Sequence, residues 1–283
     1  MAYLQGTSNN DRLLGTNFGD VIRGFGGQDT LEGFGGNDYI RGDDGDDLLY
    51  GDGGYDYLLG GSGQDTIHGG SGGDYIDGNS GDDRLYGESG HDDLYGGSGQ
   101  DQLFGGSGSD YIYGESGDDR LYGDGGYDYL SGGQGQDRLF GGDESDDLYG
   151  GSGDDRLYGE DGDDFLTGGD NNDILYGGND WDTLLGGSGD DYLNAGAGFN
   201  TATGGSGYDT FVVSGEGYVF ISDFEVGVDR VSFEGLNPAT LTFQSFPVIG
   251  TFIGNGINSF AQLDGVEQGN LSDDEFLKLI TRS

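Results

Sequence analysis

The apolar positions of this chain follow a period of nine residues from Gly6 to Val212, without insertion or deletion. This stretch has 207 residues, and 207 divided by 9 gives 23 copies. The eighth position of a copy is Leu or Ile in 21 of the 23, and Ala202 and Phe211 are the exceptions. Because side chains alternate across a strand, each copy is predicted to form a three-residue strand with one inward side chain.

Three further positions of the copy are nearly uniform along the chain. Position 1 is Gly in 22 of 23 copies, except at Ala195, and position 6 is Asp in 22 of 23, except at Asn200. Position 4 is Gly in 18 of 23 copies, and the others carry Asn9, Phe18, Glu144, Asn171 and Asp180. Glycine permits a positive φ angle, which tight turns need. Each strand is therefore predicted to follow a glycine-rich turn closed by a carboxylate.

The repeated phrase resembles a known family. Residues 60–68 read GGSGQDTIH and residues 69–77 read GGSGGDYID. The pattern GGxGxDxUx, with U a large apolar residue, is similar to the calcium-binding nonapeptide repeat of RTX (hemolysin-type) proteins, including secreted cyanobacterial ones. The resemblance covers about three quarters of the chain. It implies an all-β fold, a parallel β-roll (a two-sheet β-solenoid with two copies of the repeat per turn), and a small C-terminal β-rich cap.

The predicted roll has a thin interior. Neighbouring strands in a sheet lie about 4.8 Å apart, so roughly 11 turns would give a rod on the order of 55 Å long. Each turn would bury only two Leu or Ile side chains, which is too little to offset the conformational entropy of so many glycines. We therefore expect bound metal to supply the missing stability.

The RTX resemblance implies where Ca²⁺ binds. Ca²⁺ prefers six to eight oxygen ligands. The carbonyls of positions 2 and 4 and the Asp of one loop would meet the carbonyls of positions 1 and 3 and the Asp of the loop two copies later. Two examples of such sites are Gly61, Gly63 and Asp65 with Gly78, Ser80 and Asp83, and Gly70, Gly72 and Asp74 with Gly87, Ser89 and Asp92. The predicted carboxylate ligands are Asp29, Asp38, Asp47, Asp56, Asp65, Asp74, Asp83, Asp92, Asp101, Asp110, Asp119, Asp128, Asp137, Asp146, Asp155, Asp164, Asp173, Asp182, Asp191 and Asp209.

The charge of the chain agrees with this arrangement. The 54 acidic and 10 basic residues give a net charge of −44, and at most 23 − 2 = 21 ions would bring +42. The alternative is that Asp serves only as a turn residue, but a turn would also accept Asn or Ser at position 6. The sites expected to be empty or irregular are those of the loops with Asn9, Phe18, Glu144, Asn171, Asp180 and Asn200.

Composition excludes several classes of partner and structure. A net charge of −44 excludes nucleic acid as a natural partner. Without Ca²⁺, so charged and weakly hydrophobic a chain should be a disordered acidic polymer. There is no cysteine, so neither a disulfide nor a thiolate zinc site can form. The first five residues lack a signal-peptide pattern, and no apolar run is long enough for a membrane-spanning helix, so no transmembrane segment is expected.

Outward positions form two aromatic rows. On one face, position 7 supplies Arg84, Arg120, Arg138 and Arg156, and position 9 supplies Tyr50, His68, Tyr86, Phe104, Tyr122, Phe140, Tyr158 and Tyr176. On the other face, position 7 reads Tyr39, Tyr57, Tyr75, Asp93, Tyr111, Tyr129, Asp147 and Phe165. We expect stacked aromatic ladders. They either stabilise the sheets locally or form an adhesive face for self-association or glycans.

No catalytic set is apparent in the sequence. His68 and His91 are isolated, and no Ser/His/Asp set or metal-free pair of carboxylates is found. The GxGxxG strings precede no helix, and the acidic runs 43–47 and 161–164 lack the helices that flank an EF-hand loop. The protein is therefore expected not to be an enzyme.

The pattern predicts three regions: atypical N-terminal repeats over 1–23, the roll over 24–212 and a capping region over 213–283. Residues 218–224 and 227–233 alternate as short strands do, and they resemble the segment that closes RTX rolls and covers an open edge. Residues 260–266 and 271–277 resemble the C-terminal region of cyanobacterial type I secretion substrates. The type I secretion machinery is therefore an expected partner.

The resemblance implies a secreted protein located extracellularly or at the cell surface, which crosses the envelope unfolded and folds when it meets Ca²⁺. Since the repeats begin at Gly6, no enzymatic domain is expected before them. The first hypothesis is a structural, surface-layer or matrix protein that assembles through its aromatic rows or roll ends. The second is a secreted membrane-active or host-interaction protein, and the third is a small hydrolase in the tail.

Overall fold

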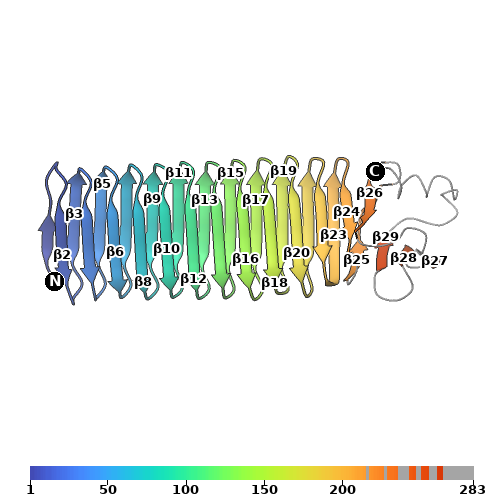
Figure 1. Cartoon of the computed structure of the whole chain (residues 1–283), viewed down its shortest axis with the longest axis horizontal. Helices are drawn as coiled ribbons and strands as arrows, with labels where there is room; N and C mark the ends of the chain where they lie inside the picture. Colours follow the sequence, from blue (N-terminus) through green and yellow to red (C-terminus); the bar gives the residue numbers. More distant parts are fainter. Residues whose placement is uncertain (215–216, 226–227, 235–241, 247–249, 255–259, 264–283) are drawn as a thin grey trace. The chain divides into compact units, whose positions relative to one another are not determined.

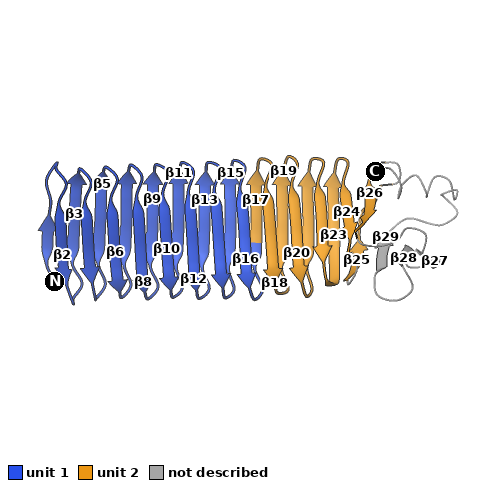
Figure 2. Cartoon of the chain, viewed as in Figure 1, with its two compact units in different colours: residues 1–147 blue, residues 148–283 orange. Residues whose placement is uncertain are grey.

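The fold of this chain is built from β-strands alone in the residues that the structure, a computed structural model, describes: 1–214, 217–225, 228–234, 242–246, 250–254 and 260–263. The chain divides into two compact units, Met1–Asp147 and Leu148–Ser283 (Figure 2). The division falls inside one strand, β17 (Asp147–Ser152). Within the described residues no helix is long and apolar enough to cross a membrane.

The first unit is a two-sheet roll in which successive strands alternate between the sheets (Figure 1). Sheet A holds β1 (Tyr3–Gln5), β3 (Val21–Gly26), β5 (Tyr39–Asp44), β7 (Tyr57–Ser62), β9 (Tyr75–Ser80), β11 (Asp93–Ser98), β13 (Tyr111–Ser116) and β15 (Tyr129–Gln134). Sheet B holds β2 (Arg12–Thr16), β4 (Thr30–Phe34), β6 (Leu48–Gly53), β8 (Thr66–Ser71), β10 (Arg84–Ser89), β12 (Gln102–Ser107), β14 (Arg120–Gly125) and β16 (Arg138–Asp143).

In the second unit, too, successive strands alternate between two sheets, and this unit ends in a small antiparallel part. One sheet holds β19 (Phe165–Asp170), β21 (Thr183–Ser188), β23 (Gly198–Ser206), β25 (Gly217–Ile221), β29 (Phe260–Leu263), β28 (Gly250–Gly254) and β27 (Thr242–Phe246). The other holds β18 (Arg156–Asp161), β20 (Ile174–Asn179), β22 (Tyr192–Gly196), β24 (Thr210–Val213) and β26 (Arg230–Phe233). The β27–β28 and β28–β29 pairs are antiparallel.

The predicted period of two copies per turn is confirmed by the strand register. Leu85 in β10 lies between Ile67 in β8 and Leu103 in β12, each two copies away, and the three strands are parallel. The eighth-position side chains are fully buried, with 0% exposure for every one from Ile22 to Leu184. The core is therefore a single column of Leu and Ile in each sheet, as the nine-residue period predicts.

The strands are longer than the three residues predicted. A regular strand has six residues, positions 7 to 9 of one copy and positions 1 to 3 of the next, as in β10. Positions 8 and 1 point inward, so Leu85 and Gly87 are both buried. The prediction failed because it counted only apolar residues, whereas the next three residues also pair with neighbouring strands and satisfy their backbone groups.

The two units together also hold more turns than predicted. Their strands β1–β26, at two strands per turn, amount to about 13 turns instead of 11. One reason is that β1 precedes the first copy and pairs with β3. The other is that β25 and β26, which correspond to the predicted strands in 218–224 and 227–233, pair in parallel with β23 and β24. Residues 264–283, and with them segment 271–277, lie outside the described residues.

Candidate calcium sites between successive loops

The position-6 aspartates are buried although they carry charge. All predicted carboxylate ligands, from Asp29 to Asp191 and also Asp209, have at most 4% of their surface exposed. Each lies where the loop turns back into a strand, one residue before the outward position 7. Since an ionised carboxylate is costly to remove from water, each requires a compensating partner.

One carboxylate oxygen of each aspartate contacts the preceding turn. The backbone N–H of Asp65 donates to Oδ1 of Asp83 at 2.7 Å, and the N–H of Asp74 donates to Oδ1 of Asp92 at 2.7 Å. The two residues of each pair are 18 positions apart. Within each unit, such hydrogen bonds link a loop to the loop one turn earlier in its own stack, as between Asp65 and Asp83 in the first unit and between Asp173 and Asp191 in the second.

The other oxygen, Oδ2, is buried and accepts no hydrogen bond along most of the stack. This holds for Asp29, Asp38, Asp47, Asp56, Asp65, Asp74, Asp83, Asp92, Asp101, Asp110, Asp119, Asp128, Asp173, Asp182 and Asp191. A Cβ atom built on Gly69 would lie 2.6 Å from Oδ2 of Asp74 and 3.0 Å from the carbonyl oxygen of Gly87. Two acceptor oxygens from successive loops therefore face one small space, which position 1 leaves open because it is glycine.

Backbone carbonyls of both loops point into the same gap. The carbonyl of Gly72, at position 4, is directed at Gly90, where a Cβ would collide with its oxygen. The carbonyl of Gly70, at position 2, accepts from the hydroxyl of Ser89 at 3.2 Å. In the opposite direction, the carbonyl of Ser89 accepts from the N–H of Gly72 at 2.9 Å. Positions 2 and 4 thus face the next turn and position 3 faces the previous one.

The structure brings together the groups predicted for both example sites. Around the second gap it places Gly70, Gly72 and Asp74 against Gly87, Ser89 and Asp92. Around the first it places Gly61, Gly63 and Asp65 against Gly78, Ser80 and Asp83, with the Ser80 hydroxyl on the Gly61 carbonyl at 3.1 Å. Their role as metal ligands stays a prediction.

Electrostatics makes the gap unfavourable for ionised aspartates unless a cation is present. Burial, and then the neighbouring aspartates, raise the pKa of Asp65 to about 7 and that of Asp83 to about 8. Hydrogen bonds from the backbone N–H of the preceding turn oppose these shifts without cancelling them. A divalent cation beside Oδ2 would stabilise the charged form directly.

The donor set fits a hard cation. Every candidate ligand is a carboxylate or carbonyl oxygen, which is the preference of Ca²⁺. Among the described residues, no group of three or more His, Cys, Asp or Glu side chains is placed to hold a metal by side chains alone. A site here therefore depends on backbone carbonyls, which only the stacking of loops brings together.

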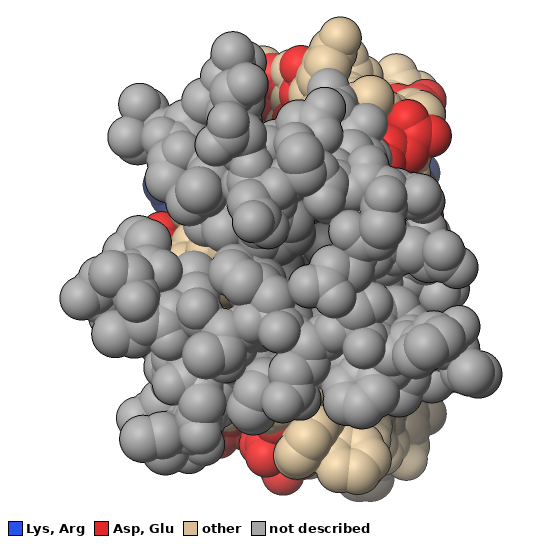
Figure 3. Space-filling view, turned by 90° about the vertical axis from the view of Figure 1, so that its right-hand side faces the viewer, with Lys and Arg blue, Asp and Glu red and all other residues tan. Residues whose placement is uncertain are grey.

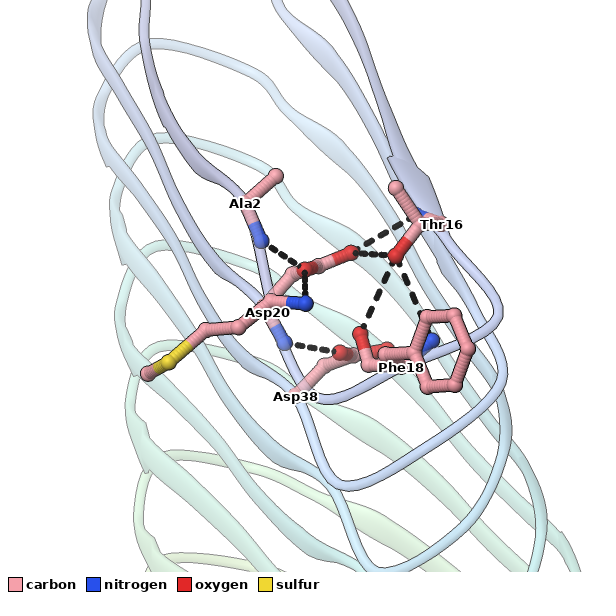
Figure 4. Close-up of polar contacts among 6 residues, drawn as sticks. Ala2, Thr16, Phe18, Asp20 and Asp38 are labelled. Carbon is pink, nitrogen blue, oxygen red and sulfur yellow. Dashed lines mark hydrogen bonds and ion pairs between the residues drawn. The ribbon is translucent and has the colours of Figure 1, made fainter.

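The first two loops satisfy their aspartates without metal, and Figure 4 shows the second of them. Thr16, at position 2 of its copy, donates to Oδ2 of Asp20 through its N–H at 2.6 Å and its hydroxyl at 2.9 Å. Thr7 makes the same two contacts to Oδ2 of Asp11, at 2.6 and 2.9 Å. Burial raises the pKa of Asp20, but hydrogen bonds from Ala2 and Thr16 outweigh it and leave that pKa lower than usual. The sequence indicates only that the repeats over 1–23 are atypical, and not that their threonines satisfy the aspartates.

The loop with Asn200 is satisfied in a different way. The Nδ2 group of Asn200 donates to the carbonyl of Ala195 at 2.7 Å, while its Oδ1 accepts from the N–H of Asp182 at 2.7 Å. An amide donor thus stands where other copies have the acceptor Oδ2. The same copy is the one with alanine at position 1, the place where other copies need space beside a carboxylate. The two departures from the repeat are therefore physically linked.

Three irregular loops nonetheless keep a positive φ angle at position 4, although it is smaller than at a regular glycine such as Gly72, where φ is 135°. Glu144, Asn171 and Asp180 stand at position 4 and have φ angles of 76°, 81° and 75°. The carbonyls of Asn171 and Asp180 remain directed at the next turn, towards Gly189 and Gly198. Asn9 and Phe18 are not among the described residues with positive φ. Whether sites in these loops are empty stays a prediction, but three of the loops retain a positive φ angle at position 4.

Outward positions carry the predicted aromatic ladders. On sheet B of the first unit, neighbouring rings stack with centroids 4.7–5.0 Å apart, through Tyr50, His68, Tyr86, Phe104, Tyr122 and Phe140. On sheet A, Tyr39, Tyr57 and Tyr75 stack at 5.3 and 4.4 Å, and Asp93 interrupts the row. Acidic side chains are visible at the upper and lower edges in Figure 3. Tyr111 and Tyr129, further along the row on sheet A, are tilted by 40° with centroids 6.0 Å apart. The ladder on sheet B is therefore confirmed, the one on sheet A is confirmed only over its first three rings, and the use of both stays a prediction.

Comparison with known proteins agrees with this geometry. A family model described as the RTX calcium-binding nonapeptide repeat, which spans four copies, matches residues 5–40, 32–67, 68–103, 95–130, 104–139, 128–157, 140–175, 158–193 and 176–211. Together these matches cover residues 5–211 without a break. A search of curated proteins found no match.

Proposed function

The chain belongs to the family of RTX calcium-binding nonapeptide-repeat proteins, and from this premise we propose that it is secreted unfolded and folds when Ca²⁺ binds between its loops. Because the site needs two stacked loops, it does not exist in the unfolded chain, and the free energy of binding becomes free energy of folding. A compartment poor in Ca²⁺ would keep the chain unfolded. A compartment rich in Ca²⁺ would close the roll.

One observation carries this proposal: the row of buried Oδ2 atoms that accept no hydrogen bond. A buried acceptor without a donor costs about 1–3 kcal/mol, and a charged one costs more. The cost recurs in nearly every turn, while each strand buries only one Leu or Ile. A cation in each gap would remove this penalty and link successive loops.

The number of ions should be below the 21 that the loop count allows. Asp11 and Asp20 already have threonine donors, and Asn200 supplies an amide in place of a carboxylate. We propose that the ions occupy the gaps between these ends, including those lined by Asp65 with Asp83 and by Asp74 with Asp92. The two ends of the array would then be stable without metal on their outer sides.

The biological role we propose is structural, at the cell surface or in an extracellular matrix, and non-enzymatic. Its support is that repeats occupy residues 5–211 and that their outward faces carry long aromatic ladders suited to self-assembly. The type I secretion machinery is the export partner that we propose for the tail. No catalytic step enters this account.

The test compares neighbouring aspartates. D92N changes a buried position-6 carboxylate, whereas D93N makes the same chemical change at the outward position 7. Circular dichroism should show coil in chelator and β-structure in Ca²⁺ for the wild type, with bound calcium counted by atomic emission. D92N should bind fewer ions and need more Ca²⁺ to fold, and D93N should match the wild type. Equal counts for both variants, or a wild type folded in chelator at a pH of about 8, would refute the proposal.

A further inference from the structure

Three arginines on sheet B of the first unit lack the ion pairs that other arginines in this unit make. Arg23 and Arg41 both pair with Asp43 on sheet A, and Arg12 pairs with Glu32 at 3.6 Å. Among the described residues, no ion pair within 4 Å includes Arg84, Arg120 or Arg138. In a chain with 54 acidic and 10 basic residues, this is unexpected by chance.

The position of these arginines in the strand explains why they have no partner. The partner of Arg12 is Glu32, which stands at position 9 of a neighbouring strand. In β10, β14 and β16, position 9 carries an aromatic ring instead of a carboxylate. The acidic residues in the same strands as Arg84 and Arg120 are Glu88 and Asp124, which stand at position 2 of the next copy, four residues further along the strand. Within its own chain Glu88 contacts Nδ1 of His68 at 2.9 Å. Four residues span roughly 13 Å, which is too far for an ion pair. Arg120 instead lies directly beside Arg138 in the ladder, an unfavourable like-charge contact.

The face thus has three parallel rows. An arginine row is on one side, the stacked ring row is in the middle, and an acidic row that alternates with glycine is on the other side. Arg84 and Arg120 are four copies apart, and so are Glu88 and Asp124. The positive and negative rows therefore share a repeat of two turns.

A surface of this kind complements itself. If a second copy is rotated by a half-turn about an axis parallel to the stacking direction of the strands, its arginine row lies opposite the first copy's acidic row. The ring rows then meet in the middle, and each strand faces the same strand of the other copy. A half-turn about the perpendicular in-plane axis would place arginine on arginine. Charge complementarity therefore selects one orientation, with the two rolls parallel.

We propose that the outer face of sheet B is a dimer interface between two copies of this chain, in which Arg84 of one copy pairs with Glu88 of the other and Arg120 pairs with Asp124. By symmetry each pair occurs twice. This inference rests on the proposed function, because only the calcium-folded roll presents the rows.

The size of the surface is sufficient for a specific contact. Strands β6 to β16 of sheet B extend roughly 29 Å, at about 4.8 Å per strand, and six-residue strands are roughly 20 Å long. The product is roughly 600 Å² per copy, or about 1,200 Å² in total, at the lower limit of specific protein interfaces. The stacked rings supply rigid apolar contact at the centre, and the ion pairs lie at its two sides.

The test reverses charges on the full chain in saturating Ca²⁺ and measures mass by sedimentation equilibrium. The wild type should be dimeric. R84E/R120E makes both rows acidic at β10 and β14, and E88R/D124R makes both rows basic there, so each alone should raise the dissociation constant about a hundredfold or more. An equimolar mixture of these two variants should form heterodimers, and the fourfold variant should dimerise again. The control D93R/E115R makes two equivalent reversals on sheet A and should dimerise as the wild type does.

Circular dichroism on the same samples separates this inference from the proposed function. A chain that remains coil in Ca²⁺ contradicts the proposed function. A folded wild type that is monomeric contradicts the interface alone. The interface is also contradicted if either double variant dimerises as tightly as the wild type, or if the mixture of the two does not associate.

Discussion

Replacing Gly69 with alanine should abolish one calcium site by filling it. The new methyl group would lie 2.6 Å from Oδ2 of Asp74, 3.0 Å from the carbonyl oxygen of Gly87 and 3.1 Å from Cδ1 of Ile76. The first two atoms belong to the proposed site, and the third is in the core. Gly69 has no left-handed φ angle, so backbone strain does not add to the effect.

The cost can be estimated from two terms. One ion present at about 100 times its dissociation constant contributes about 2.7 kcal/mol of stability, which the variant would lose. Forcing a methyl group against Oδ2 of Asp74 and Cδ1 of Ile76 adds an overpacking cost of about 1–3 kcal/mol. G69A should therefore lower the free energy of unfolding in saturating Ca²⁺ by about 4–6 kcal/mol.

The assay is urea unfolding at saturating Ca²⁺, together with a count of bound calcium. The matched control is G125A, because a Cβ on Gly125 would meet only the carbonyl oxygen of Gly106, at 3.9 Å, and its φ angle is not left-handed. G125A should match the wild type or exceed it by up to about 1 kcal/mol. If G69A binds as much calcium and unfolds at the same urea concentration as G125A, the gap beside Gly69 is not a metal site.

Three further changes test other parts of the stack. The double variant A195G/N200D should bind one more calcium ion than the wild type, as a count of bound calcium would show. N200D alone should bind no additional ion, because the Ala195 methyl group would still fill the space beside the new carboxylate. T16V should lower the free energy of unfolding by about 1 kcal/mol by removing the hydroxyl donor to Asp20, and T66V, at an outward position 7, should stay within about 0.5 kcal/mol. Burial, and then neighbouring carboxylates, raise the pKa of Asp83 to about 8 from 3.8. The metal-free roll therefore binds more protons than the unfolded chain over that interval, and it should gain stability as the pH falls from about 8 towards 4, while its calcium affinity falls. Circular dichroism in chelator and calcium titrations across this range would show opposite trends, and a metal-free roll that is most stable at high pH would contradict the buried-carboxylate account.

The sequence predicts the parts of this structure that repeat. A period of nine with Leu or Ile at position 8 determines the register, as the alignment of Ile67, Leu85 and Leu103 shows. The Asp at position 6 and the Gly at position 1 indicate that a carboxylate lies close to the backbone of its own loop. They do not indicate which of its two oxygens accepts a hydrogen bond.

The parts that the sequence does not predict depend on contacts between loops one turn apart and within the irregular loops. The hydrogen bonds that Thr16 donates to Asp20 and that Asn200 donates to Ala195 become apparent only in the folded loops. The strand length was predicted wrongly because backbone pairing, and not side-chain pattern, extends the strands into positions 1 to 3. Among the described residues Arg84 likewise has no ion-pair partner because Glu88 stands four residues further along β10, and composition does not show this spacing.

The central claim is that cations lie between successive loops and contact the buried Oδ2 atoms. The most direct measurement is an anomalous-difference map from crystals grown in Ca²⁺ and collected at a wavelength where calcium scatters anomalously. We predict peaks in the gaps between Asp65 and Asp83 and between Asp74 and Asp92, and none beside the amide of Asn200. A folded roll with no peak in the first two gaps would contradict the account.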